Sequence, residues 1–399
     1  MLDKGLLTAS VVWLSNEEHP GRDLAAGWLT RGFGPNEWKQ ECPLRSPPIE
    51  DLLEVVMHAV IGVDPHKATH TAVVVNDRED ELARKKVRAC RTQVTQLLCW
   101  AEPFPQRTWA IEGADGLGYL LAQQLVAAGE TVVNVPATLA ARTRVLATGR
   151  SNKNDPNDAL SVAITALRYD GLRRVSPAGH ADVLRLLAKR NTDLGRQRSR
   201  QVSRLHAVLV ELTPGGIAKE INASDVDGFL AAVDPAGPTE QVRVDLALEL
   251  LDDIRRLDGQ LKASHKTIRT AVDASGTTVT DLYGVGPIVA AMLIGHTGDI
   301  GRFENRDRYA AYNGTAPIEI GSGERSIRRV SKRGNRKLNH AIHLAAITQL
   351  RQPTTAGRIY FDRKVDEGKT KREALRSLKR HISNAVYRQL LADARRAAG

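Results

Sequence analysis

An α/β domain followed by two largely helical regions is the fold class that the sequence predicts, and three observations lead to it. Short apolar runs rich in β-branched residues alternate with helical patterns over residues 57–177. Apolar residues recur at spacings of three and four through residues 178–273. The last segment, 274–399, combines short helical patterns with a dense basic run. We therefore expect three folded regions after an N-terminal extension.

The composition favours a globular protein that binds nucleic acid. The 399 residues include 57 Lys and Arg against 46 Asp and Glu, which gives a net charge of +11. A basic composition of this kind is typical of proteins that bind a polyanion such as nucleic acid. No apolar run reaches the length of a membrane span, and no secretory signal pattern is present. Three scattered cysteines argue for a reducing compartment and against a zinc site. We expect a cytoplasmic protein without membrane contact.

The first 56 residues differ from the rest of the chain. Their net charge is −4, whereas the remaining residues carry +15. They hold three of the five tryptophans and five prolines, and they show no clean hydrophobic period. We expect residues 1–56 to be an acidic extension that is disordered, or a stretch translated from a start codon upstream of the true start at Met57.

The elements expected within 57–177 follow the order β-β-β-α-β-α-β-α. The strands are expected at 58–63, 69–76, 85–89, 108–111 and 131–135, and the helices at 92–102, 116–128 and 154–168. Turn and cap residues such as Asn76-Asp77 and Gly129 bound these segments. Three antiparallel strands followed by α/β units is the order of the RNase H-like fold, in which the first and fourth strands lie side by side.

Four carboxylates fall at the ends of elements that this fold brings together. Asp64 ends the first strand, Glu112 ends the fourth, and Asp155 and Asp158 share a face at the start of the last helix. A carboxylate cluster of this kind needs cations, and its hard oxygen ligands suit Mg²⁺ or Mn²⁺. Two such metals can clamp a phosphodiester during in-line displacement. Each acid alone also fits a plainer role as a turn residue, a surface acid or a favourable charge at a helix N-terminus.

Residues 178–273 carry two long helical patterns. They cover 183–212 and 242–272, and a stretch containing Gly, Pro and Asp joins them. Two long helices joined by a turn-rich tip suggest an antiparallel coiled coil. The periodicity is sparse, so a plain helical bundle fits the same pattern. Arginines along the first helix could contact a nucleic-acid backbone.

The region 274–399 contains two candidate phosphate-binding segments. Gly284-Val285-Gly286 lies between short helical patterns, which resembles a helix-hairpin-helix whose turn offers N–H groups to a phosphate, although GxG also serves as an ordinary turn. Residues 321–340 hold seven Lys and Arg and one Glu, ahead of an apolar helix at 341–350. We interpret this run as a phosphate-binding loop rather than a solvated face. The basic residues expected to contact nucleic acid are Arg325, Arg328, Arg329, Lys332, Arg333, Arg336 and Lys337.

Six motifs in order carry a resemblance to a known family. They are "GVDPHK" (62–67), "IEG" (111–113), "NDPNDA" (154–159), "GVGP" (284–287), "AAYNGTAP" (310–317) and "SGERSIRRVSKRGNRKL" (322–338). With these motifs, residues 57–399 resemble the DEDD transposases of bacterial and archaeal insertion sequences. This is the group known as IS-one-ten, whose members work as bridge-RNA-guided recombinases.

The resemblance implies a division of labour between the regions. An N-terminal RuvC-like domain would hold the acidic tetrad, matching Asp64, Glu112, Asp155 and Asp158. A coiled coil would separate it from a mainly helical transposase domain whose nucleophilic serine corresponds to Ser322, with Ser326 and Ser331 as rivals. The serine would form a covalent link to DNA, which conserves the phosphodiester energy for rejoining. The implied partners are donor and target DNA, a guide RNA and further copies of the chain in a dimer or tetramer, associated with a prokaryotic nucleoid.

Three other functions compete with this interpretation. A RuvC-like Holliday-junction endonuclease would use the same carboxylates with water as the nucleophile. Actin-like ATPases and sugar kinases share the strand order, but they carry a glycine soon after the first-strand aspartate, where this chain has Pro65-His66-Lys67. A catalytically inactive nucleic-acid-binding protein is the third alternative, and the intact carboxylate set argues against it.

Overall fold

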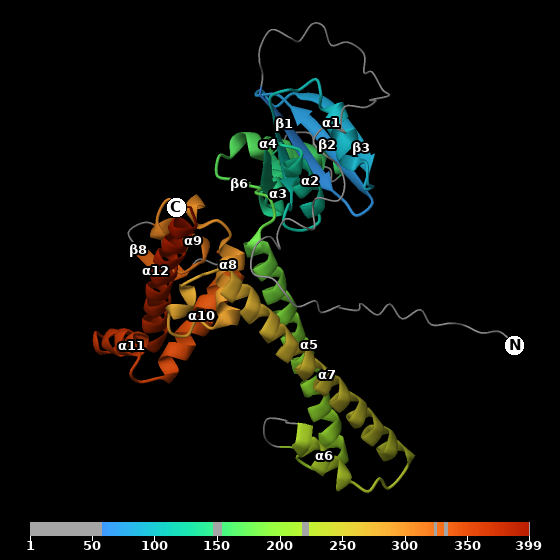
Figure 1. Cartoon of the computed structure of the whole chain (residues 1–399), viewed down its shortest axis with the longest axis vertical. Helices are drawn as coiled ribbons and strands as arrows, with labels where there is room; N and C mark the ends of the chain where they lie inside the picture. The colour runs from blue at the N-terminus through green and yellow to red at the C-terminus, as the bar shows by residue number, and fades with distance from the viewer. Residues whose placement is uncertain (1–57, 147–153, 218–222, 323–324, 331–333, 399) are drawn as a thin grey trace, which may run out of the picture. The chain divides into compact units, whose positions relative to one another are not determined.

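The computed structural model describes residues 58–146, 154–217, 223–322, 325–330 and 334–398 (Figure 1). The chain divides into two compact units, one ending at Pro177 and one beginning at Ala178. The acidic extension, 1–56, lies outside the described residues. Among the described helices, none is both long and apolar enough to cross a membrane.

The first unit is built on a mixed six-stranded sheet with the order β3-β2-β1-β4-β5-β6. Its strands are β1 (Ala59–Pro65), β2 (Thr69–Val75), β3 (Glu81–Arg88), β4 (Arg107–Glu112), β5 (Val132–Val135) and β6 (Arg173–Arg174). The first three strands pair antiparallel, and β4 and β5 continue parallel to β1. The predicted order of elements and the pairing of the first with the fourth strand are confirmed, and the short β6, antiparallel to β5, was not predicted.

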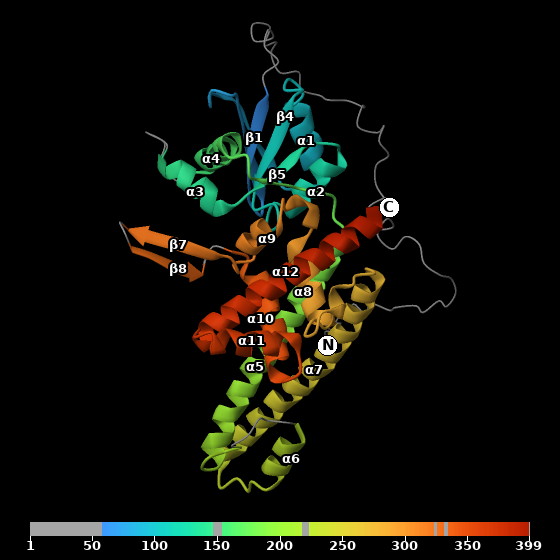
Figure 2. The same cartoon turned by 90° about the vertical axis from the view of Figure 1, so that its left-hand side faces the viewer.

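Helices cover both faces of this sheet, as Figure 2 shows. They are α1 (Gln93–Trp100) and α2 (Tyr119–Ala127) on one face, and α3 (Ala137–Leu146) and α4 (Asp155–Arg168) on the other. The alternation of strand side chains divides the core accordingly, because Ile61 and Val63 join the cluster with α1 and α2 whereas Val60 joins the cluster with α4. The helix α3 occupies a basic stretch for which no helix was predicted.

A glycine on β1 allows α4 to lie unusually close to the sheet. A Cβ atom at Gly62 would stand 2.2 Å from the carbonyl oxygen of Ala159 and 2.4 Å from the amide nitrogen of Ala163. Only a residue without a side chain permits this approach. The close packing brings the N-terminal turn of α4 next to the end of β1, where Asp64 lies.

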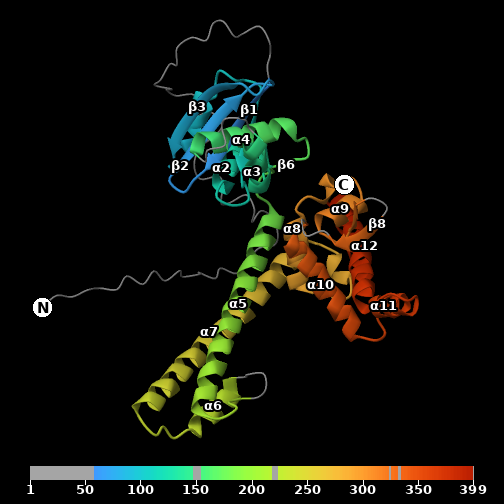
Figure 3. The same ribbon diagram turned by 180° about the vertical axis from the view of Figure 1, so that it is seen from behind.

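The second unit begins with two long antiparallel helices, α5 (His180–Leu212) and α7 (Pro238–Ala274). Side-chain pairs along the two helices show their opposite directions, since Arg198 bonds Asp258 and Arg243 bonds Glu211. The short helix α6 (Ala223–Ala231) packs at the far end of the pair, where the sequence predicted only a turn-rich tip (Figure 3). The N-terminal end of α5 and the C-terminal end of α7 pack into the core formed with the remaining helices of this unit.

The rest of this unit is mainly helical with one β-hairpin. Its elements are η2 (Val279–Asp281), α8 (Pro287–Thr297), η3 (Ile300–Arg302), α9 (Arg306–Tyr312), β7 (Pro317–Ser322), β8 (Arg325–Val330), α10 (Arg336–Arg351), α11 (Ala356–Asp366) and α12 (Lys371–Ala398). The basic run 321–340 was predicted to be a loop, and this is wrong for Gly321, Ser322 and Arg325–Val330, which belong to the antiparallel pair β7–β8. The core of this unit combines aliphatic side chains with an aromatic group, in which the fully buried Tyr309 lies 5.2 Å from the ring of Phe303 and 5.7 Å from that of Tyr387, measured between ring centroids.

Candidate active site

The carboxylates Asp64 and Glu112 end adjacent parallel strands on the face that α4 covers. Val63 pairs with Ile111, so the next residues in β1 and β4 are neighbours. Asp64 follows Gly62 by two residues and therefore points to the same face, toward α4. Asp64 is only 7% exposed, and Glu112 is half-buried. The strand ends thus supply two carboxylates that are mostly withdrawn from solvent.

The first turn of α4 supplies the other two predicted carboxylates. Asn154 caps the helix, because its side-chain oxygen accepts a hydrogen bond of 2.9 Å from the backbone N–H of Asn157, and Pro156 fits the first turn. The plainer explanation of Asp155 and Asp158 as favourable charges at this terminus still applies. However, capping itself does not require either carboxylate.

A histidine that the sequence analysis did not single out lies between Asp64 and Asp155. The Nδ1 atom of His66 is 3.5 Å from Oδ2 of Asp64, and its Nε2 atom is 4.0 Å from Oδ1 of Asp155. One ligand atom from each of these three residues lies within 4.8 Å of the others. The signal that could have found His66 was its place two residues after Asp64 in the first motif.

Two basic side chains pair with the aspartates of α4. Lys86 on β3 donates to Oδ2 of Asp155 over 2.8 Å, and this bond lowers the pKa of the Asp155 carboxyl. Arg144 on α3 forms an ion pair with Asp158. The helix α3 is held beside α4 by a 2.8 Å hydrogen bond between the hydroxyls of Thr143 and Thr165. These two cations offset part of the negative charge of the cluster.

The pKa of Glu112 links three of the predicted carboxylates, Asp64, Glu112 and Asp158. Burial raises the pKa of its carboxyl, and the negative charges of Asp64 and Asp158 raise it further, whereas Arg144 and His66 oppose this shift. Glu112 therefore lies within the field of both aspartates, although it falls outside the tight group of Asp64, His66 and Asp155. Repelling oxygen donors of this kind fit a hard divalent cation such as Mg²⁺, which would relieve their repulsion.

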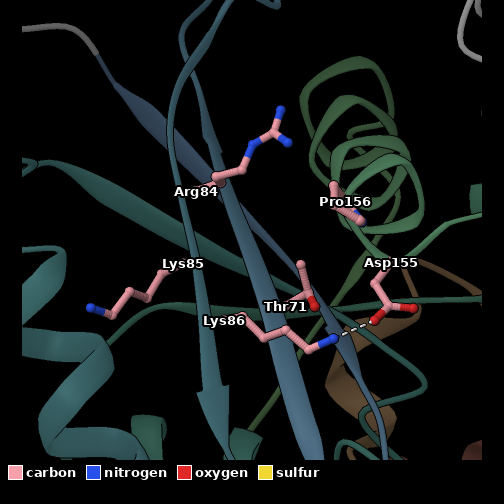
Figure 4. A pocket seen from close by; sticks show the side chains of 6 residues that line it. All are labelled: Thr71, Arg84, Lys85, Lys86, Asp155 and Pro156. Carbon is pink, nitrogen blue, oxygen red and sulfur yellow. Dashed lines mark hydrogen bonds and ion pairs between the residues drawn. The ribbon is translucent and has the colours of Figure 1, made fainter.

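A pocket of about 130 Å³ adjoins this cluster. Its lining residues are Thr71, Arg84, Lys85, Lys86, Asp155 and Pro156 (Figure 4). The pocket lies over β2 and β3 at the first turn of α4. A molecule bound there would therefore touch Asp155, which is next to both Lys86 and His66. At this end of the sheet, acidic side chains on β1 and α4 therefore lie next to basic side chains on β3.

Segments of both units match models of known protein families. Residues 61–214 match a family model described as a DEDD transposase, and residues 276–360 match one described as a transposase of the IS116/IS110/IS902 family. The chain belongs to this transposase family. It is therefore a DNA-processing enzyme, and the family assignment predicted from the six motifs is confirmed.

Relatives of the transposase align along most of its length. The chain is 26% identical to a 44.8 kDa protein of the insertion element IS116 of Streptomyces clavuligerus, over 83% of this chain and 94% of the relative. It is also 26% identical to a 42 kDa protein of IS900 of Mycobacterium paratuberculosis, over 82% of this chain and 94% of the relative. Among solved structures, Thermus thermophilus RuvC aligns with 29% of this chain and 99% of its own, at 16% identity and a TM-score of 0.24.

The two predicted glycines of the second unit lie at the start of α8. Gly284 has a φ of +84°, and a Cβ atom there would stand 2.7 Å from the carbonyl oxygen of Ala345 on α10. This conformation and this close approach both call for glycine. Gly286 is the N-cap of α8, and Val285 between them is buried. Packing of the turn against α10 thus explains Gly284 without a bound phosphate.

The predicted nucleophile and its basic neighbours lie in or beside the β-hairpin. Ser322 is the last residue of β7 and stands opposite Arg325, the first residue of β8. Arg328 and Arg329 follow on β8, opposite Glu319 and Ile318. The structure gives the strand positions of these residues, and Lys332 and Arg333 lie outside the described residues. Arg336 and Lys337 are exposed in the first turn of α10.

Proposed function

We propose that this transposase cleaves and rejoins DNA strands at a divalent-metal site formed by Asp64, Glu112, Asp155 and Asp158, with Ser322 as the nucleophile. The single observation that carries the metal site is the convergence of acidic side chains at one end of the sheet: ligand atoms of Asp64, His66 and Asp155 lie within 4.8 Å of one another, and Asp64 and Asp158 raise the pKa of Glu112. A protein without catalytic use for this end of the sheet would gain nothing from half-burying three mutually repelling acids.

The side chains of the first unit have distinct roles in this proposal. A bound Mg²⁺ or Mn²⁺ would polarise the phosphate and offset the charge that develops on it. Asp64 supplies a rigidly oriented oxygen ligand, because it extends from a buried strand. Lys86 and Arg144 hold Asp155 and Asp158 in their present orientations. His66 can accept or donate a proton next to Asp64, since its ring nitrogens face both aspartates.

The serine step conserves the energy of the phosphodiester. The Oγ atom of Ser322 attacks phosphorus and loses its proton to a base or to solvent, while the bond to one deoxyribose oxygen breaks and that oxygen takes up a proton. The strand remains joined to the protein as a phosphoserine diester. A hydroxyl of another strand then attacks the same phosphorus and releases the serine. The resemblance of the motif around Ser322 supports this assignment, and Ser326 and Ser331 remain the rivals.

The basic run supports contact with nucleic acid in the second unit. Arg325, Arg328 and Arg329 follow Ser322 on the next strand, and Arg336 and Lys337 extend the series into α10. The same series, together with Lys332 and Arg333, is the proposed contact with donor and target DNA and with a guide RNA. The turn at Gly284 and Gly286, which precedes α8, is the proposed helix-hairpin-helix-like element.

The finer architecture is also part of the proposal. In this proposal the paired helices α5 and α7 are the coiled coil, which lies in the sequence between a RuvC-like domain at 57–177 and a transposase domain at 274–399. Exposed Val210, Val242 and Leu246 on these helices support association with further copies of the chain, in a dimer or tetramer.

A test of the proposal uses purified protein, the RNA that copurifies with it, and DNA carrying the ends of its own insertion element. We expect Asp64→Asn to abolish strand cleavage and to leave DNA binding unchanged, because the basic contacts remain. Asp77→Asn, an exposed acid in the same unit, is the matched control and should cleave normally. Wild-type cleavage by Asp64→Asn would refute the metal site.

The covalent step has its own readout. Wild-type protein should form a DNA adduct that survives denaturant, and Ser322→Ala should not. An adduct that persists in Ser322→Ala moves the nucleophile to another residue. Cleavage without any adduct would instead support the endonuclease that hydrolyses DNA with water.

A further inference from the structure

A row of side chains with changing chemistry crosses the sheet beside the carboxylates. Asp64 on β1 stands directly opposite Thr71 on β2, and Thr71 stands directly opposite Lys86 on β3. Residues that face one another across antiparallel strands project to the same side of the sheet. The row therefore runs from an acid through a hydroxyl to an ammonium group, all on the face that α4 covers.

The hydroxyl in the middle of this row has no partner within the described part of the chain. Thr71 is 4% exposed, and its Oγ1 atom makes no hydrogen bond to any described residue. A buried hydroxyl without a partner loses its bonds to water and gains nothing in return. Thr71 lines the pocket next to Asp155, so its hydroxyl is available to a group that enters there.

Two cations frame the same pocket and retain unused donors. Arg84 and Lys86 are two residues apart on β3 and project to one side, whereas the side chain of Lys85 points away from Asp155 (Figure 4). An ammonium group has three donors, and Lys86 gives one of them to Asp155. A guanidinium has five, and Arg84 directs its Nε to Glu81. The remaining donors and the Thr71 hydroxyl form a site for a tetrahedral oxyanion.

We propose that this pocket binds a backbone phosphate of the DNA strand, adjacent to the phosphate on which the carboxylate cluster acts. The inference rests on the proposed function for its choice of DNA. Asp155 belongs to both the cluster and the pocket wall, so a strand lying on the cluster presents its next phosphate to Lys86, Arg84 and Thr71. The subsite would hold the strand in register without reading its sequence.

Binding of a labelled duplex from an end of the element tests this proposal. Full-length protein is titrated over a series of NaCl concentrations in Ca²⁺, so that affinity is measured apart from cleavage. Lys86→Gln should reduce the slope of log affinity against log salt by about 1, as loss of one phosphate contact requires. Arg78→Gln removes one positive charge at an exposed position in the turn between β2 and β3, outside the pocket lining, and should leave the slope unaltered.

Thr71 separates a specific contact from a general charge effect. Thr71→Val removes the hydroxyl at nearly constant shape and should weaken binding about tenfold without changing the salt slope, because a hydrogen bond to a charged group is lost. Thr71→Ser retains the hydroxyl and should bind as the wild type does. Circular dichroism on each variant identifies any loss of folding, and Lys86 is exposed, so its substitution tests the pocket even if Thr71→Val fails to fold.

The outcomes separate this inference from the function on which it rests. Equal slopes for Lys86→Gln and Arg78→Gln, together with wild-type affinity for Thr71→Val, would overturn the phosphate subsite. If Lys86→Gln weakened the binding of an RNA duplex of the same sequence and left the binding of the DNA duplex unchanged, the choice of DNA as the ligand would be overturned. A separate result, normal cleavage by Asp64→Asn, would refute the proposed metal site.

Discussion

Replacing Gly62 with alanine should damage both the stability of the first unit and its catalysis, because this glycine sets the distance between β1 and α4. The new Cβ would stand 2.2 Å from the carbonyl oxygen of Ala159 and 2.4 Å from the amide nitrogen of Ala163. Both are backbone atoms inside a helix, so neither can rotate away. To reach an ordinary contact near 3.4 Å, α4 must withdraw from the strand by about 1 Å.

Two magnitudes follow from this displacement. Overpacking of a well-filled core costs about 1–3 kcal/mol of unfolding free energy. A misplacement of about 1 Å between catalytic groups can lower a rate by about 100-fold. Since α4 carries Asp155 and Asp158 while β1 carries Asp64, the withdrawal changes the distances within the cluster directly. Cleavage should therefore fall far more than the remaining folded fraction would explain.

The assay combines urea unfolding, followed by the fluorescence of the buried Trp109, with the cleavage assay under conditions where the protein remains folded. Gly116→Ala is the matched control in the same unit, because its Cβ would meet only an ordinary contact of 3.5 Å. It should change neither quantity much. Wild-type stability and cleavage in Gly62→Ala would refute the view that close packing of α4 on β1 positions the carboxylates.

Two further predictions concern charge and buried polar groups. In metal-free protein the pKa of Glu112 is raised on folding, so its contribution to stability is present below the unfolded pKa and is lost as pH rises through the folded value. Glu112→Gln should thus unfold at higher temperature than the wild type at neutral pH without metal, and this advantage should vanish in acid or in excess Mg²⁺; an equal melting temperature at neutral pH would contradict the prediction. Asn313, fully buried, donates to the hydroxyl of Ser383 over 2.7 Å, so Asn313→Ala should cost about 1–3 kcal/mol in urea unfolding by stranding that hydroxyl. The comparison variant is Asn305→Ala, which replaces the exposed N-cap residue of α9. If Asn313→Ala lowered the free energy of unfolding by less than Asn305→Ala does, a structural role for this bond would be contradicted.

Much of the first unit was predictable because its signals are local. The strands around Asp64 and Glu112 are short apolar runs whose ends coincide with polar residues, and the start of α4 carries a cap and a proline. A known order of elements then places the ends of β1 and β4 side by side. The four carboxylates could be chosen on these grounds before any distance was known.

Among the elements that escaped prediction, α3 and the hairpin β7–β8 depend on contacts with residues outside their own segments. The helix α3 contributes Ala140 to the buried cluster that it shares with α4, and its apolar residues show no clear helical period. The hairpin β7–β8 consists largely of glycine, serine, arginine and isoleucine residues, and pairing between its strands, rather than an apolar alternation, makes it a sheet. Local propensity could not distinguish either segment from a loop.

By itself, the sequence determined the family, the order of elements in the first unit and the carboxylates at the ends of its strands, since motifs, periodicity and caps are written in neighbouring residues. Only the tertiary structure decided what surrounds those carboxylates. His66, Lys86 and Arg144 reach the cluster, and the hydroxyl of Thr71 lies between Asp64 and Lys86, because of strand register and helix packing. Register depends on pairing between residues far apart in the chain, and a shift of one residue would turn each of these strand side chains to the opposite face.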